Sequence, residues 1–228
     1  MAIAIGFKVM PYVHMALSHM KMIHPMATAA TNPIGIILAG GKSSRMGTDK
    51  AALRMNGESL LKRMRRVLLA AGCTQVILSG HCRDDWEDEF IPDLLPNLGP
   101  VGGIISVMFW AKNYVPANTS FVFIPVDAPL LSADLIASLH RFDDSSNGCC
   151  ISDSPLPLVL KTTEDVFIQS DFAFADFEAK GTSWSVRRFI EPLSLKGFDV
   201  NDPIKNQLTN VNTPPQWESL LRELENRS

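Results

Sequence analysis

The residues with the clearest chemical potential are glycines and cations in the segment ILAGGKSSRMGTDK, from Ile37 to Lys50. Gly40 and Gly41 let the main chain come close to a bulky anion and point N–H groups at it. Arg45 is able to hold a phosphate through two parallel hydrogen bonds, and Lys50 adds a mobile point charge. The spacing matches neither a P-loop nor a dinucleotide-binding fingerprint. The segment therefore predicts a cradle for a triphosphate, and the plainer alternative is a solvated, glycine-containing loop.

A second candidate is Asp127, in the stretch IPVDAPLL directly after an apolar run. A lone carboxylate at the mouth of a strand is typically a ligand of a hard cation or a helix cap. The next helix is expected to begin with Ser132 as its N-cap, which makes capping by Asp127 the weaker interpretation. A Mg²⁺ ion held by Asp127 would bridge nucleotide phosphates and neutralise their charge.

The elements that must position these residues alternate along the chain from Pro33 onward. Short apolar runs predict strands, and amphipathic segments with caps predict helices. This alternation predicts an α/β fold, a three-layer α/β/α Rossmann-like sandwich around a mostly parallel sheet, in a single domain. Ligands of such sheets lie beyond the carboxyl ends of the strands. That rule predicts that residues 38–41, 79–80 and 125–127 meet at one edge.

Composition narrows the class of protein. The chain has 228 residues, 46% of them apolar, and a net charge of −3, which gives no bias toward nucleic acid or an anionic membrane. Its four cysteines show no metal-site spacing, which favours reduced thiols in a cytoplasmic protein. Residues 1–32 are rich in methionine and interrupted by histidines and Lys21, so they predict no membrane span. We expect them to be an N-terminal extension, disordered or not native, ahead of a single folded domain at 33–228.

Four motifs carry a family resemblance. Residues 38–50 resemble the pattern L-A-G-G-x-S-x-R-M-G-x-D-K of the nucleotidyltransferases that share the fold of the nucleotide-sugar enzymes. The AGG and DK within it favour the molybdenum cofactor guanylyltransferase family. GPVGGIISV, IPVDAPLL and NVNTPPQWESL follow in the expected order, and the similarity runs from Ile34 to the end of the chain.

The resemblance implies transfer of GMP from GTP to the terminal phosphate of molybdopterin, with release of pyrophosphate. On that basis Arg45, Lys50 and Asp127 would form the catalytic set, with Asp127 holding Mg²⁺ and Arg45 the departing pyrophosphate. Asp93 would accept hydrogen bonds from guanine N1–H and N2–H, a pairing suited to guanine and not to adenine. The other nucleotide- and pterin-binding residues implied are Leu38, Ala39, Gly40, Gly41, Ser79, Asn210 and Asn212, the two asparagines on the pterin side.

Two alternatives stay open at this point. One is a cytidylyltransferase or a sugar-phosphate nucleotidyltransferase on the same fold. The other is a non-catalytic nucleotide-binding adaptor, although a mere binder would not need both Lys50 and Asp127. The expected small-molecule partners are GTP and molybdopterin, with transient contacts to molybdoenzymes or their chaperones.

Overall fold

A computed structural model describes residues 32–40, 49–81, 83–95, 98–142 and 145–226 of the chain. Within these ranges seven strands form one sheet, in the order β5-β4-β1-β6-β8-β7-β9. β1, β4, β5 and β6 are mutually parallel neighbours, whereas β8 runs antiparallel to both β6 and β7. The prediction of a mostly parallel sheet is confirmed. The strands are β1 (Ile34–Leu38), β4 (Gln75–Gly80), β5 (Phe90–Pro92), β6 (Ser120–Pro125), β7 (Gly148–Ile151), β8 (Ser154–Lys161) and β9 (Lys196–Phe198).

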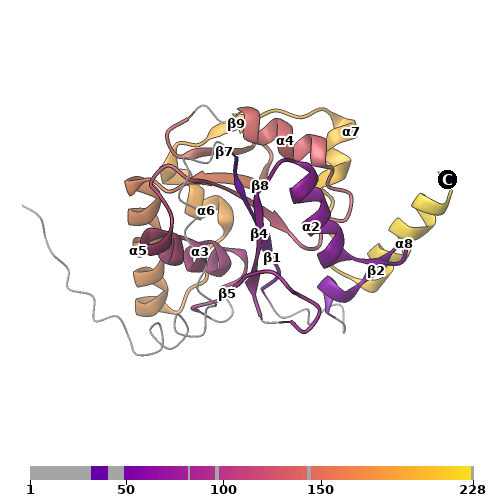
Figure 1. The fold of residues 1–228 in the computed structure, drawn as a ribbon, viewed down its shortest axis with the longest axis horizontal. Coiled ribbons are helices and arrows are strands. Elements are labelled where there is room, and N and C mark those ends of the chain that lie inside the picture. The colour runs from indigo at the N-terminus through magenta and orange to yellow at the C-terminus, as the bar shows by residue number, and fades with distance from the viewer. Residues whose placement is uncertain (1–31, 41–48, 82, 96–97, 143–144, 227–228) are drawn as a thin grey trace, which may run out of the picture.

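Helices cover both faces of this sheet, which gives the predicted three layers (Figure 1). On one face the buried side chains of α3, α5 and α6 pack together with Phe121 and Phe123 of β6. On the other face, those of α2 and α4 pack with Ile37 and Val122. The helices are α2 (Leu60–Ala70), α3 (Pro100–Tyr114), α4 (Ala133–Phe142), α5 (Glu164–Lys180), α6 (Val186–Ile190), α7 (Asp202–Lys205) and α8 (Pro214–Glu225).

The central strands are short apolar runs because both of their faces are covered. Ile36, Ile37 and Leu38 of β1 are all buried, as are Phe121 to Pro125 of β6. A parallel strand covered on both faces shows continuous rather than alternating hydrophobicity. This explains why these strands were predictable from the sequence.

Smaller elements complete the described chain. A two-stranded hairpin of β2 (Arg54–Met55) and β3 (Glu58–Ser59) precedes α2. Short 3-10 helices lie at η1 (Lys50–Ala52), η2 (Glu191–Leu193) and η3 (Asn206–Leu208). The expected N-cap of α4 is present, because Ser132 Oγ accepts a hydrogen bond from Leu135 N at 3.2 Å. In the described part of the chain, no helix has the length and apolarity needed to cross a bilayer.

Candidate active site

The carboxyl ends of three parallel strands meet at one edge of the sheet, as the sequence predicted. Leu38, the last residue of β1, is in register with Ser79 of β4 and with Pro125 of β6. Beyond the strand, Ala39 N donates to Ser79 O at 2.9 Å, and Val126 N donates to Leu38 O at 3.2 Å. These bonds hold Ala39, Ser79 and Val126 together, so side chains just beyond them converge.

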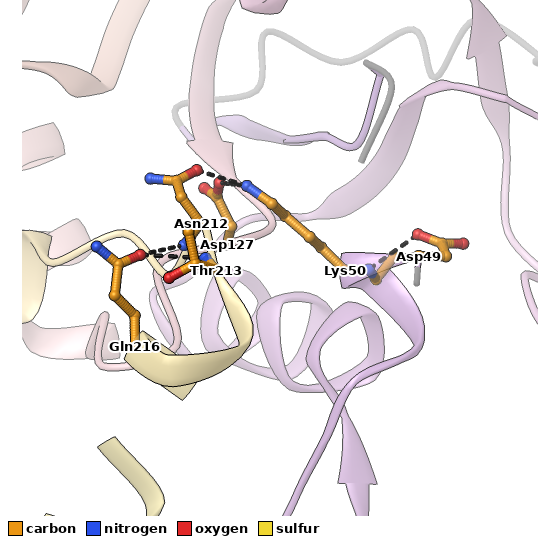
Figure 2. Close-up of polar contacts among 7 residues, drawn as sticks. Asp49, Lys50, Asp127, Asn212, Thr213 and Gln216 are labelled. Atoms are coloured by element: carbon orange, nitrogen blue, oxygen red, sulfur yellow. Dashed lines mark hydrogen bonds and ion pairs between the residues drawn. The ribbon is translucent and has the colours of Figure 1, made fainter. Parts of the chain in front are cut away.

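Three of the predicted site residues contact one another at this edge. The Lys50 ammonium donates to Asp127 Oδ2 at 2.7 Å and to Asn212 Oδ1 at 2.6 Å. Figure 2 shows Lys50 reaching from η1 into the space between these two oxygens. The Lys50 and Asp127 side chains are each only 17% exposed. Residues 77 and 162 positions away from Lys50 in the chain therefore form one partly buried polar cluster with it. We call Lys50, Asp127 and Asn212 the cation-side cluster.

Hydrogen bonds hold the main chain of Asp127 and Asn212, the two residues that supply the oxygens of this cluster. Asp127 O accepts a hydrogen bond from Val211 N at 2.8 Å, which fixes the segment before α8 against the end of β6. At the start of α8, Gln216 Oε1 accepts from Asn212 N at 2.8 Å and from Thr213 N at 3.1 Å (Figure 2). The Gln216 contact to Thr213 N is half of a capping box at the start of α8. The caps of α8 therefore also position Asn212.

A second group of site residues, Gly40, Ser79 and Asp93, lies at the same edge on the β4 and β5 side; we call it the base-side cluster. A Cβ atom added to Gly40 would overlap Asp93 Oδ2 and lie 3.2 Å from Asp93 Cγ. Gly80, at φ +137°, leaves room for the same main chain, since a Cβ there would lie 2.7 Å from Gly40 N. At Gly80 only glycine fits, because the overlap would be with main chain and φ is positive, whereas at Gly40 an added Cβ would force the Asp93 carboxyl to move. The close approach brings the Asp93 carboxyl against the first residue of the predicted phosphate cradle.

The base-side cluster contains buried polar atoms that no neighbour satisfies. Among the described residues, Ser79 Oγ and Asp93 Oδ1 are the buried side-chain oxygens or nitrogens without a hydrogen-bond partner. Burial raises the pKa of the Asp93 carboxyl, and the nearby His81 and the adjacent Ser79 side chain only partly offset that effect. Unsatisfied buried polar atoms are uncommon in folded proteins and mark functional sites when they lie together. Donors from a ligand would satisfy both atoms.

The other predicted residues fall in several places. Leu38 is buried and Ala39 is half-buried at the end of β1, where both can line a ligand. Asn210 is exposed two residues before Asn212. Gly41 and Arg45 lie outside the described residues, so their expected roles stay predictions.

The structure adds two positioning residues that the sequence did not indicate. The Arg83 guanidinium forms an ion pair with Asp49, and Asp49 Oδ1 in turn accepts from Ala51 N at 3.0 Å, which caps the helix that begins at Lys50. Ser106 Oγ of α3 accepts from Leu94 N at 2.9 Å and so fixes the segment that carries Asp93. Arg83 lies outside the four motifs, whereas Ser106 lies within GPVGGIISV. Neither was singled out from the sequence, because each acts through a partner elsewhere in the chain.

The cation-side cluster also fits a divalent cation. In the described ranges no group of three or more His, Cys, Asp or Glu side chains could hold a metal, so an all-protein metal cage is absent there. Mg²⁺, however, is usually held by one or two protein oxygens together with substrate phosphates and waters. Asp127 Oδ2 and Asn212 Oδ1 already converge on a positive charge, that of Lys50. The donor set is therefore the kind that magnesium uses when it binds with a nucleotide.

This fold, with glycines and a lysine–carboxylate cluster beyond the parallel strands, defines a nucleotidyltransferase. The family described as "MobA-like NTP transferase domain" matches residues 35–163. A molybdenum cofactor guanylyltransferase of Xanthomonas euvesicatoria is 36% identical over 190 residues, which are 83% of this chain and 94% of the relative. One of Rhizobium meliloti is 30% identical, over 87% of this chain and 96% of the relative. The chain belongs to the molybdenum cofactor guanylyltransferase family.

Solved structures share the fold at low sequence identity. The molybdopterin-guanine dinucleotide biosynthesis protein A of Archaeoglobus fulgidus superposes with a TM-score of 0.61 at 18% identity, covering 85% of this chain and 99% of that one. A Mycobacterium tuberculosis protein in complex with manganese superposes with a TM-score of 0.50 at 17% identity, covering 84% of this chain and 99% of that one. Both likenesses bear on the fold alone.

Proposed function

We propose that this protein transfers GMP from GTP to the terminal phosphate of molybdopterin, releasing pyrophosphate and forming the guanine dinucleotide form of the molybdenum cofactor. The observation that carries the proposal is the meeting of the two clusters at one sheet edge. The base-side cluster has unsatisfied acceptors, and the cation-side cluster has charge and hard oxygen ligands. Membership in a family whose relatives are named molybdenum cofactor guanylyltransferases supports the same choice of substrates.

The base-side cluster suits guanine. Asp93 Oδ1 is a buried acceptor in need of a donor, and guanine presents two adjacent donors, N1–H and N2–H, to a carboxylate. Adenine presents one donor and one acceptor on the equivalent edge, so a carboxylate would face a lone pair there. The Ser79 hydroxyl supplies a further hydrogen-bonding group beside the base.

The phosphates would lie between Gly40 and Lys50. Gly40 offers a close main-chain approach, and the Lys50 ammonium offers a positive charge that a flexible stem can redirect. We assign Gly41 and Arg45 to the same phosphates, with Arg45 on the departing pyrophosphate, on the strength of their motif positions. A magnesium ion bound by Asp127 and the phosphates would supply neutralisation of the charge that develops at the α-phosphate and the leaving group.

Catalysis asks little covalent chemistry of the side chains. The attacking oxygen belongs to a phosphate that is already anionic, so no strong general base is required. Rate enhancement then comes from in-line positioning and from charge stabilisation. For the acceptor, we assign Asn210 to the pterin side because it is exposed just beyond the cation-side cluster. Asn212 lies between the two substrates and contacts Lys50 directly.

The decisive experiment is release of pyrophosphate from GTP when molybdopterin is supplied. We expect release that depends on molybdopterin and Mg²⁺, with GTP far better than CTP, UTP or ATP. A folded protein that binds GTP but releases no pyrophosphate under these conditions would instead be the nucleotide-binding adaptor. Thermal stabilisation by CTP and not by GTP would make it a cytidylyltransferase.

The cellular setting is part of the same proposal. Among the described residues, Cys73, which is buried, and Cys150 are thiols outside any disulfide, which supports a reducing compartment such as the cytoplasm. The product would have to reach molybdoenzymes or their chaperones, so we expect transient contacts with them. Co-purification with such proteins would test this expectation. We expect a small bound fraction that increases when GTP and molybdopterin are present.

A further inference from the structure

The cation-side cluster contains a conflict between two roles. The proposed function needs the Lys50 ammonium on the nucleotide phosphates and a divalent cation on Asp127. In the structure, however, the ammonium lies 2.7 Å from Asp127 Oδ2 and 2.6 Å from Asn212 Oδ1. An ammonium and a divalent cation at the same two oxygens would repel each other strongly in a partly buried place. One cation must leave before the other can bind.

The geometry indicates which of the two partners moves. Asp127 is held through its main-chain oxygen by Val211 N at 2.8 Å, and Asn212 through its own N–H by Gln216 Oε1 at 2.8 Å. These bonds hold the main-chain positions that carry both side-chain oxygens. Lys50 reaches the site on a flexible four-carbon stem, while Asp49 caps the short helix that carries its backbone. The flexible stem allows the ammonium to swing away while all three main-chain positions stay where they are.

We propose that Lys50 is an internal counter-cation that occupies the divalent-cation site before a nucleotide binds. The ammonium leaves this site only when a nucleoside triphosphate arrives. This inference rests on the proposed function for the identity of the ligand that draws Lys50 away. The phosphates offer the ammonium several anionic oxygens, and they offer the incoming metal ion further ligands. Metal and nucleotide then bind as one unit, and free metal alone binds only weakly.

The exchange solves an electrostatic problem. A partly buried carboxylate with no cation nearby is costly, and so is a buried ammonium that has lost its carboxylate. With the exchange, Asp127 is partnered by Lys50 before the nucleotide binds and by the metal ion afterwards. The exchange also makes the affinity for metal depend on bound nucleotide. Because such coupling is reciprocal, bound metal must raise the affinity for nucleotide by the same factor.

The test is a titration of the nucleotide-free protein with Mn²⁺, read as free Mn²⁺ by electron paramagnetic resonance. We compare wild type with Lys50→Met, which keeps the length of the stem and removes the charge, and with Lys50→Gln as a second neutral variant. We expect weak binding by wild type and at least a tenfold gain in affinity in both variants. Adding Asp127→Asn or Asn212→Ala to Lys50→Met should abolish the gain. Lys112→Met is the matched control, because Lys112 forms a surface ion pair with Asp171 away from the site.

Two results would overturn the exchange. One is a folded Lys50 variant that binds Mn²⁺ no more tightly than wild type. The other is a gain that survives loss of the Asp127 carboxylate and the Asn212 amide. The experiment is separable from the catalytic assay. If wild type transfers no GMP but the Lys50 variants bind Mn²⁺ more tightly, the exchange stands and the proposed function fails. If wild type transfers GMP but the variants show no gain in Mn²⁺ affinity, only the exchange fails.

Discussion

The two clusters at the active edge differ in how completely they satisfy themselves. In the cation-side cluster every charge has a partner: Lys50 contacts both Asp127 and Asn212. In the base-side cluster, Ser79 Oγ and Asp93 Oδ1 are buried and lack partners among the described residues. A ligand at the base-side cluster can therefore add hydrogen bonds without breaking any. At the cation-side cluster, the contacts of Lys50 must break before a ligand can bind. Changes on the cation side should act on turnover, and changes on the base side on nucleotide affinity and selectivity.

The largest expected effect is that of Asp127→Asn. This change keeps the shape of the side chain but removes the negative charge from the metal ligand and from the partner of Lys50. We expect kcat for pyrophosphate release to fall by roughly 100- to 1,000-fold, the scale of losing one preorganised electrostatic contact. The folded fraction, followed by circular dichroism, should be unchanged. Asp134→Asn, on the exposed face of α4, is the control. Retained turnover in Asp127→Asn would show that Asp127 holds no metal in catalysis.

Gly40→Ala should separate affinity from turnover on the base side. The added methyl group would overlap Asp93 Oδ2, so either the carboxyl or the end of β1 must shift. We expect KM for GTP to rise by about 100-fold, the scale of a displacement of about 1 Å at a reacting site, with a smaller effect on kcat. Gly197→Ala on the edge strand β9 is the control, since its Cβ would meet Ser152 first, with the hydroxyl at 2.7 Å, and lies away from the nucleotide edge. An unchanged KM in Gly40→Ala would place the nucleotide elsewhere.

Asp93→Asn tests which atoms read the base. An amide at this position accepts one hydrogen bond but presents a donor to the other guanine N–H. We expect the preference for GTP over ITP, which lacks the 2-amino group, to shrink by about tenfold or more, since hydrogen bonds to charged groups contribute about 1.5–3 kcal/mol. Competition binding with both nucleotides measures this ratio directly. If the ratio stays constant, the guanine edge is read by residues other than Asp93.

Arg83→Gln should give a smaller effect on the cation side. Arg83 pairs with Asp49 and, at 3.2 Å, with Asp85, and it is only 15% exposed. Its loss loosens the cap of the helix that begins at Lys50. We expect kcat/KM to fall roughly fivefold, equivalent to about 1 kcal/mol for an ion pair that is half in solvent.

Two companion variants make the positioning role of Arg83 specific. Arg83→Lys keeps the charge and should restore most of the activity. If Arg83 acted only through the packing of its side chain, the charge alone would not restore it. Arg65→Gln removes an ion pair with Asp88 from the same segment of chain without touching Asp49, and should leave kcat/KM unchanged. Equal losses in Arg83→Gln and Arg65→Gln would mean that the segment as a whole matters, and not the contact to Asp49.

Arg83 was not predicted from the sequence, and other parts of the site show where prediction succeeded and where it stopped. Leu38, Ser79 and Asp127 were placed at one edge beforehand, because buried parallel strands leave continuous apolar runs and their carboxyl ends share an edge. The contact of Lys50 with Asn212 spans 162 residues and depends on how α8 docks, which no local pattern encodes. The antiparallel insertion of β8 between β6 and β7 was equally invisible, since strand direction leaves no trace in an apolar run.

The smallest expected effect is a pH dependence of stability that comes from the base side. Burial raises the pKa of Asp93 in the folded protein. The folded state therefore holds this proton more tightly than the unfolded state, so the contribution to stability is fully present below the unfolded pKa and is lost as pH rises through the folded pKa. Asp93→Asn should accordingly raise the melting temperature by a few degrees at neutral pH and not in acid. Saturating GTP should reverse the order at neutral pH, because only the wild-type carboxylate gains the guanine donors. A wild-type protein that stays less stable than Asp93→Asn even with GTP would mean that the buried charge is never paired by the base, and the contrast between the two clusters would fail on the base side.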